Sequence, residues 1–343
     1  MKPFPHILFV FLLVASSSIV VAQEPPTPSA PTKTESKEAK IPAPNKDLVA
    51  STKPMDAAGQ KQIKDFITNR FEKISGDDVK ESRQATTDIL LVLRQSAATP
   101  MFLRACFDNI KPYIPEILAK QDSFRTGNML EIVRWTQTPD GLDILIEQVN
   151  PSTQKNTVIR MGASRLLAGC IASASLTAPQ IDRASRRIRE ASEFEPEWIV
   201  SMHEMESLAQ LIAISQNPTK PDLKLDQQLK MGRDEFLKIL AGTAAKVSNP
   251  KLGGTDQIFA LQRGLIILRD MLLKTPKNQV VEIASIIRPI TEISIRISNQ
   301  IASDKSVTNG SLKESAKNAA ITANSINTLL GVKPSAPPAK TPA

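Results

Sequence analysis

The sequence contains few of the residues on which common catalytic sites depend. It has two histidines and two cysteines in 343 residues, and His6 lies in an N-terminal segment that we expect to be removed. The other histidine, His203, cannot by itself form an HExxH zinc site or any site with two histidine ligands. We interpret it as a packing or surface histidine. No GxSxG, GxGxxG or GxxxxGK[ST] motif is present to present a serine nucleophile or to bind phosphate. We therefore predict no catalytic, metal-binding or cofactor-binding residue, and no cofactor.

Aromatic residues are also scarce, with two Trp, one Tyr and eleven Phe. This argues against a sugar-binding site built on aromatic side chains. A pair of carboxylates could still serve as general acid and base. The chain has 35 Asp and Glu residues, so the sequence does not single out a pair. A hydrolase or lyase of the cell envelope that uses paired carboxylates stays open as an alternative to a non-catalytic role.

The first 22 residues have the pattern of a secretory signal. Lys2 supplies a positive charge, the apolar segment 7–15 follows, and Val20-Val21-Ala22 fits the small-residue cleavage rule. An uncleaved anchor is the alternative, but serines at 16–18 interrupt the stretch, and a membrane span needs ~20 apolar residues. We predict cleavage after Ala22 and an exported protein, periplasmic or extracellular. After cleavage, no transmembrane segment is expected.

Two proline-rich segments are predicted to be disordered because they have little apolar surface to bury. They are the tether 23–55 and the tail 332–343. Between them we predict two helical regions, 56–217 and 226–331. The formal net charge is +8 for the whole chain, but part of it lies in the signal and the two proline-rich segments. The remaining bias is mild and does not indicate a nucleic-acid partner.

The two cysteines leave two alternatives open. In an exported protein, Cys106 and Cys170 could form a disulfide. Each lies in an apolar helical context, "FLRACFDNI" and "LLAGCIASA", in which a cysteine is commonly a small buried hydrophobic residue.

A cluster of arginines is the main concentration of positive charge. Arg183, Arg186 and Arg187 share one helical face, with Arg189 beside them. Three guanidinium groups at this spacing could bind phosphate or carboxylate groups, and the same residues could equally form a solvated helix face. A binder of anionic envelope polymers through the Arg183–Arg189 helix is therefore a further alternative.

Three similar segments begin at Thr99, Thr138 and Thr177, at equal spacings of 39 residues. Threonine is a good N-cap, proline is favoured in the first helical turn, and Thr177 with Gln180 matches a capping box. Positions 4, 7, 8 and 11 after each threonine repeat as one face of an α-helix. These positions are Leu103, Cys106, Phe107, Ile110, Leu142, Leu145, Ile146, Val149, Ile181, Ala184, Ser185 and Ile188.

A second helix is predicted after each of these, over 124–136, 157–174 and 197–215. A helix pair that recurs at about 40 residues resembles the HEAT/armadillo class of helical repeats. The segment "VIRMGASRLLAGCIASA" carries the resemblance best, because its Ala/Gly-rich face would let neighbouring helices approach closely. The resemblance covers residues 99–215. It implies an all-α fold with stacked helix hairpins, and an extended surface for partners.

The C-terminal region has narrower apolar seams, typical of helical bundles. We predict that proline at 289 kinks or splits the third helix, and that Ser311 with Glu314 caps the last. The segment "EISIRIS" alternates like a strand, but its helical flanks favour a helix. A closed bundle is favoured, with a seam left open for a partner helix as the alternative. The third seam consists of Ile283, Ile286, Ile290, Ile293 and Ile297.

Taken together, the sequence predicts an all-α protein with solenoid-like stacked hairpins followed by a helical bundle. We expect an exported, non-catalytic scaffold or protein-interaction module of the cell envelope, with one or more protein partners there and no nucleic-acid partner. The oligomeric state is left open. This expectation about function comes from architecture rather than from a reactive group.

Overall fold

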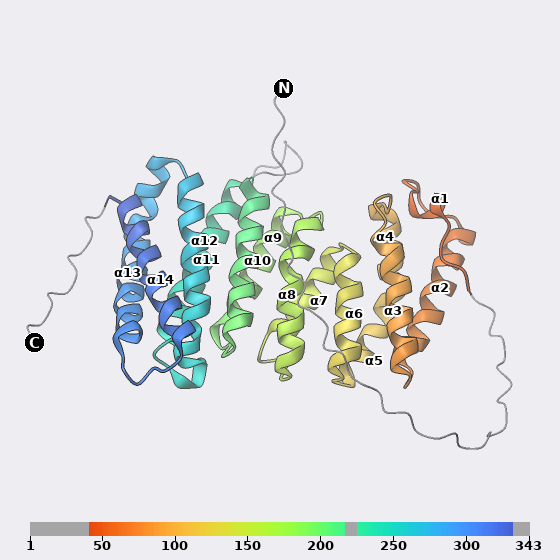
Figure 1. Cartoon of the computed structure of the whole chain (residues 1–343). Helices are drawn as coiled ribbons and strands as arrows, with labels where there is room; N and C mark the ends of the chain where they lie inside the picture. Colours follow the sequence, from red (N-terminus) through yellow and green to blue (C-terminus); the bar gives the residue numbers. More distant parts are fainter. Residues whose placement is uncertain (1–40, 217–224, 332–343) are drawn as a thin grey trace, which may run out of the picture. The chain divides into compact units, whose positions relative to one another are not determined.

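The computed structural model describes residues 41–216 and 225–331, and these are helical with no strand (Figure 1). The predicted signal 1–22 and tail 332–343 lie outside the described residues. The helices of the first half are α1 (Lys46–Val49), α2 (Ala57–Ser75), α3 (Val79–Leu93), α4 (Pro100–Ile110), α5 (Ile114–Ala119), α6 (Ser123–Trp135), α7 (Pro139–Val149) and α8 (Thr157–Ser173). They are followed by α9 (Ala178–Glu193), α10 (Trp198–Gln216), α11 (Asp226–Lys246), α12 (Gln257–Lys274), α13 (Lys277–Ser303) and α14 (Gly310–Leu329). Short 3₁₀ turns occupy Lys111–Tyr113, Pro250–Leu252 and Gly254–Asp256.

The 39-residue spacing marks three helix starts, as predicted. Thr99 accepts a hydrogen bond from the Phe102 amide at 3.3 Å at the start of α4. Thr138 does the same at the start of α7, and Thr177 forms the predicted capping box at the start of α9. All twelve residues of the predicted apolar faces are buried. The second helices α6, α8 and α10 begin and end within about one residue of the predicted bounds.

Most helices pack on a helix one or two places along the chain. The helices α6, α8, α10, α12 and α14 contact one another in that order, and α7, α9, α11 and α13 form a second series. Consecutive members α7 and α8, α9 and α10, and α13 and α14 also pair. Helix α11 packs on both α9 and α10, and one hydrophobic cluster includes residues from Val49 to Leu330. The two predicted regions therefore share a core.

The end of the predicted tether differs from expectation. Residues 41–55 are described, and they include helix α1, capped by Asn45 and anchored by the fully buried Val49. Thr99 fixes this segment twice, because its amide donates to the Val49 carbonyl at 3.1 Å and its hydroxyl donates to the Ser51 carbonyl at 2.6 Å. The prediction of disorder up to residue 55 overlooked these anchors because proline dominates the local composition.

Helix α13 differs from expectation in two ways. It runs continuously through Pro289, whose missing N–H would have bonded to the Ser285 carbonyl. Both residues are exposed, so water can reach that carbonyl. The buried seam is also rotated from the predicted one, which leaves Ile286 and Ile293 50% and 39% exposed. The residues actually buried are Val280, Ala284, Ile287, Ile290, Thr291, Ser294, Ile297, Ser298 and Ile301.

Helix α14 is capped by Asn309, which accepts from the Leu312 amide at 3.2 Å, rather than by Ser311 with Glu314. The segment "EISIRIS" is helical, as predicted. Within the described ranges, no helix is both long enough and apolar enough to cross a membrane.

Candidate functional site: a buried charge cluster and an open groove

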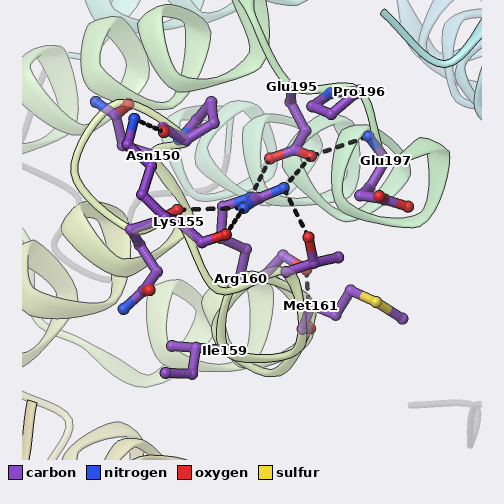
Figure 2. A network of polar contacts seen from close by, with 12 residues as sticks. Asn150, Lys155, Ile159, Arg160, Met161, Glu195, Pro196 and Glu197 are labelled. Atoms are coloured by element: carbon purple, nitrogen blue, oxygen red, sulfur yellow. Dashed lines mark hydrogen bonds and ion pairs between the residues drawn. The ribbon is translucent and has the colours of Figure 1, made fainter. Parts of the chain in front are cut away.

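A buried ion pair joins α8 to the turn between α9 and α10. Arg160 lies on the buried face of α8, and Glu195 lies in the turn, with side chains 5% and 0% exposed. Arg160 Nε donates to Glu195 Oε2 at 2.7 Å, and Nη2 donates to Oε1 at 3.1 Å. Figure 2 shows the guanidinium and the carboxylate facing each other in this two-point contact, which is the strongest geometry for such a pair.

The remaining donors of this guanidinium are also used. Nη1 donates to the Gln154 and Lys155 carbonyls at 3.2 and 3.1 Å, and Nη2 donates to the Thr157 hydroxyl at 3.3 Å. A guanidinium has five N–H donors, and all five of those of Arg160 are satisfied within the chain. The arginine therefore fixes the turn against α8 and has no donor left for a ligand.

Lys246 joins the same turn to α11. Its Nζ donates to the Ser192 carbonyl and, at 3.0 Å, to the Glu195 carbonyl. Because α9 ends at Glu193, the ammonium satisfies carbonyls at the negative end of the helix dipole. Burial lowers the pKa of Lys246, while the carboxyl groups of Glu204 and Glu195 act in the opposite direction.

Glu204 of α10 is the member of this cluster whose carboxyl group has no hydrogen-bond partner. Its side chain is fully buried, and neither carboxyl oxygen has a hydrogen-bond partner. Burial raises the pKa of this carboxyl well above its ordinary value, and the neighbouring Glu195 raises it further, against the opposing effect of Lys246 and Arg160. The neutral acid is therefore the form that the fold favours.

This buried charge cluster, which consists of Arg160, Glu195, Glu204 and Lys246, was not predicted from the sequence. A signal was present in the helical phase of its members. Arg160 has the phase of the buried Ala163, Ser164 and Leu167, and Glu204 has the phase of Ser201, Leu208 and Leu211. A charged residue in an apolar helical stripe needs a partner when it is buried. The identity of that partner depends on tertiary contacts.

The predicted anion-binding arginines are mostly engaged with an acidic residue of the preceding hairpin. Arg183 and Arg187 donate to the two oxygens of Asp143 at 2.7 and 2.9 Å. Arg186 is exposed and has no ion-pair partner among the described residues. Arg189 pairs with Glu235 of α11 at 3.1 Å. The structure therefore uses this face mainly to join α9 to α7 and α11.

The cysteines and the histidine are also placed. Cys106 and Cys170 are free and buried, so the structure contains two buried thiols and no bond between them. Burial raises the pKa of both, that of Cys170 to about 12. His203 Nδ1 lies 3.0 Å from Glu206 Oε2 on the same helix, and Glu206 also accepts from Arg263 of α12 at 2.8 Å. These contacts join helices and do not assemble a reactive group.

An open groove of about 670 Å³ lies between the start of α2 and α4. Its one carboxylate, Asp108, is paired with Arg104 at 3.0 Å. Lys64 is exposed and has no ion-pair partner among the described residues. The groove is lined by apolar residues Pro54, Met55, Ala57, Met101 and Ala105, and by polar residues Gln60, Lys61, Lys64, Arg104, Asp108 and Asn109.

Comparison with protein-family models, with curated proteins and with solved structures finds no match to this chain. In the buried charge cluster, every donor of Arg160 is used within the chain and Glu204 is closed off from solvent. The groove instead exposes apolar side chains beside Lys64, which has no ion-pair partner among the described residues.

Proposed function

We propose that the chain is a non-catalytic protein-interaction scaffold, and that the groove between α2 and α4 binds a segment of a protein partner. The observation that carries this proposal is the lining of the groove. It combines apolar side chains with the exposed Lys64, which has no ion-pair partner among the described residues, whereas Lys61 pairs with Asp65, and Arg104 pairs with Asp108 and Asp140. Such a surface suits a partner segment with apolar anchors and acidic flanks.

The absence of opposed carboxylates in the groove favours binding over acid–base hydrolysis. Glycoside hydrolysis needs two carboxyl groups facing each other across the substrate, and Asp108 faces Arg104 instead. Elsewhere, the buried Glu195 and Glu204 belong to a cluster that holds helices together. Their chemistry is consistent with a structural role.

We further propose that the helix hairpins form a HEAT-like array, and that the protein acts after export, in the cell envelope. Two observations support the array. From α6 onward, helices two places apart in the sequence contact each other. The residue five positions after Thr99, and the one five positions after Thr138, each form an ion pair with the next helix pair. At these positions, Arg104 pairs with Asp140 at 3.2 Å, and Asp143 pairs with Arg183 and Arg187. The proposed location rests on the signal-like segment 1–22.

Site-specific photo-cross-linking in cells tests the proposed function. A photoreactive amino acid replaces Met101 or Lys64 in the groove, and the matched control replaces Val158 of α8, an apolar residue that is 64% exposed. We expect mass spectrometry to identify one or a few recurrent proteins, cross-linked from positions 101 and 64 but not from 158. Equal labelling from all three positions, or no protein above background, would contradict the groove as a partner site.

A charge reversal gives a second readout of the same proposal. Lys64→Glu changes an exposed side chain on the groove, and Lys230→Glu on α11 serves as a control at a distant exposed position. If acidic flanks of the partner contact the groove, Lys64→Glu reduces recovery of the cross-linked partner while Lys230→Glu does not. The proposal fails if the two variants recover the partner equally.

A further inference from the structure

The outward face of α13 carries a stripe of residues that no other described element covers. Glu282, Ile286, Pro289, Ile293 and Arg296 follow one another at steps of four and three residues, so they lie along one face of the helix. All five are exposed, and the two isoleucines are 50% and 39% exposed. The opposite face of α13 packs against α14 and α11.

The two charged residues of this stripe have no partner within the described chain. Neither Glu282 nor Arg296 forms an ion pair or a side-chain hydrogen bond there. Earlier helices of the same series behave differently, since α7 pairs with α9 through Asp143, and α9 pairs with α11 through Arg189 and Glu235. Helix α13 is the last of this series among the described residues, so its outward charges lack the neighbour that the earlier helices have.

The stripe is complementary to itself when it is read in the opposite direction. Glu282 lies seven residues before Pro289, and Arg296 lies seven residues after it. Ile286 and Ile293 lie three residues before and four residues after the same proline. Two copies of α13 packed antiparallel, with Pro289 near the two-fold axis, would place each Glu282 opposite an Arg296 and each Ile286 opposite an Ile293. A two-fold interface requires this reciprocity, whereas a parallel pair would place like charges together.

We propose that α13 is a self-association surface, and that its partner is a second copy of this chain packed antiparallel across Pro289. The charges favour a second copy of the chain as the partner. Glu282 and Arg296 lie at equal distances on either side of Pro289, so each faces the opposite charge when two copies of α13 pack antiparallel. The stripe from Glu282 to Arg296 is about 21 Å long at 1.5 Å per residue. An interface of this size is at the small end of specific interfaces, so we expect a reversible dimer of about micromolar affinity.

The test is a charge swap, measured by sedimentation velocity on the full purified chain from about 1 to 200 µM, concentrations that bracket a micromolar dissociation constant. Glu282→Arg places two arginines at each end of the interface, and Arg296→Glu places two glutamates there. We expect each single variant to raise the dissociation constant by at least about tenfold. The double variant E282R/R296E restores opposite charges and is expected to dimerise within about threefold of the wild type.

Mixing the two single variants provides the sharper outcome. Glu282→Arg carries two arginines and Arg296→Glu carries two glutamates, so an equimolar mixture should form heterodimers at concentrations where each variant alone is monomeric. Circular dichroism checks that the variants are folded, which we expect because both positions are exposed and unpaired. The dimerisation proposal fails if the wild type is monomeric throughout, if the single variants dimerise normally, or if the mixture does not associate.

Two other occupants of the stripe are distinguishable in the same experiment. If a chain ending at Gly331 dimerises and the full chain does not, the segment 332–343 competes for the face, and the proposal for the native chain is wrong. If the full chain stays monomeric and binds only a different protein through α13, the proposal is also wrong. None of these outcomes bears on the groove between α2 and α4, so the proposed function and this inference can fail separately.

Discussion

Replacing Arg160 by methionine tests whether the buried charge cluster stabilises the helical fold. Methionine keeps much of the apolar stem but removes the guanidinium and its five donors. Glu195, which is 0% exposed, then loses the cation that faces it. Removing one partner of a buried ion pair costs about 3–5 kcal/mol, because the remaining charge stays buried without compensation. We expect the free energy of unfolding to fall by that amount.

Chemical denaturation measures this change, followed by circular dichroism for the whole chain and by tryptophan fluorescence for the surroundings of Trp135 and Trp198. The matched control is Arg183→Met, since the Arg183 side chain is 51% exposed and pairs with Asp143 at 2.7 Å. An exposed pair of this kind contributes only about 0–1 kcal/mol. Comparable losses in the two variants would refute the reasoning from burial.

A double variant separates the charge from the packing. Arg160→Met combined with Glu195→Gln removes both charges and keeps an oxygen that can accept from the Glu197 amide, which donates to Glu195 Oε1 at 2.9 Å in the native chain. Because the uncompensated carboxylate is gone, we expect the double variant to regain at least half of the stability lost in Arg160→Met. No recovery would show that the loss came from packing rather than from charge.

Three further predictions concern Glu204, two glycines and the two cysteines. Glu204 has a raised pKa in the folded chain, so the folded form retains a proton that the unfolded form releases, and wild-type stability falls as pH rises above the unfolded value of about 4.3. Glu204→Gln removes this dependence. Measured by urea titration, the free energy of unfolding of the variant relative to the wild type should rise by up to about 1.4 kcal/mol per pH unit, up to the pKa of Glu204 in the folded chain. A constant difference from pH 4 to 8 would contradict this. Gly253 has φ of 96°, and an added Cβ would lie 2.2 Å from the Pro196 carbonyl oxygen. Gly253→Ala should therefore lower the free energy of unfolding by more than about 1–2 kcal/mol. Gly242 lies in the middle of α11 with no atom within 4 Å of an added Cβ, so Gly242→Ala should raise the free energy of unfolding by about 0.5–1 kcal/mol. The thiols of Cys106 and Cys170 are buried with raised pKa, so a thiol reagent should label neither in the native chain and both after unfolding; rapid native labelling would show that one is accessible.

Local signals in the sequence predicted much of the helical fold. Thr99, Thr138 and Thr177 carry their capping information within a few residues, so the starts of α4, α7 and α9 could be placed. Helix α1 was missed because only Val49 and a few apolar neighbours anchor a proline-rich segment. For such a short helix, tertiary contacts decide the conformation.

The rotated seam of α13 shows where periodicity alone fails. Isoleucines recur at helical spacing there, but the buried face instead contains Thr291, Ser294 and Ser298. The hydroxyl groups of Thr291 and Ser294 have hydrogen-bond partners, as when Thr291 donates to Asn327 of α14 at 2.7 Å, whereas the hydroxyl of Ser298 has none. Small polar residues let α14 approach, so packing geometry outweighed hydrophobicity. The buried charge cluster was missed for a related reason, since its partners come from distant parts of the chain.

The contacts of Arg160 and Lys246 have a consequence for how the chain would respond to a pulling force. Through the turn at 194–197, these two side chains connect α8, α9 and α11 at one point. If tension were applied between residues 41 and 331, helices not held by these contacts would unfold one after another. Helices α8, α9 and α11 would have to unfold in a single step. We therefore expect a force–extension trace with small early steps and one larger rupture, and Arg160→Met should divide that rupture into smaller ones.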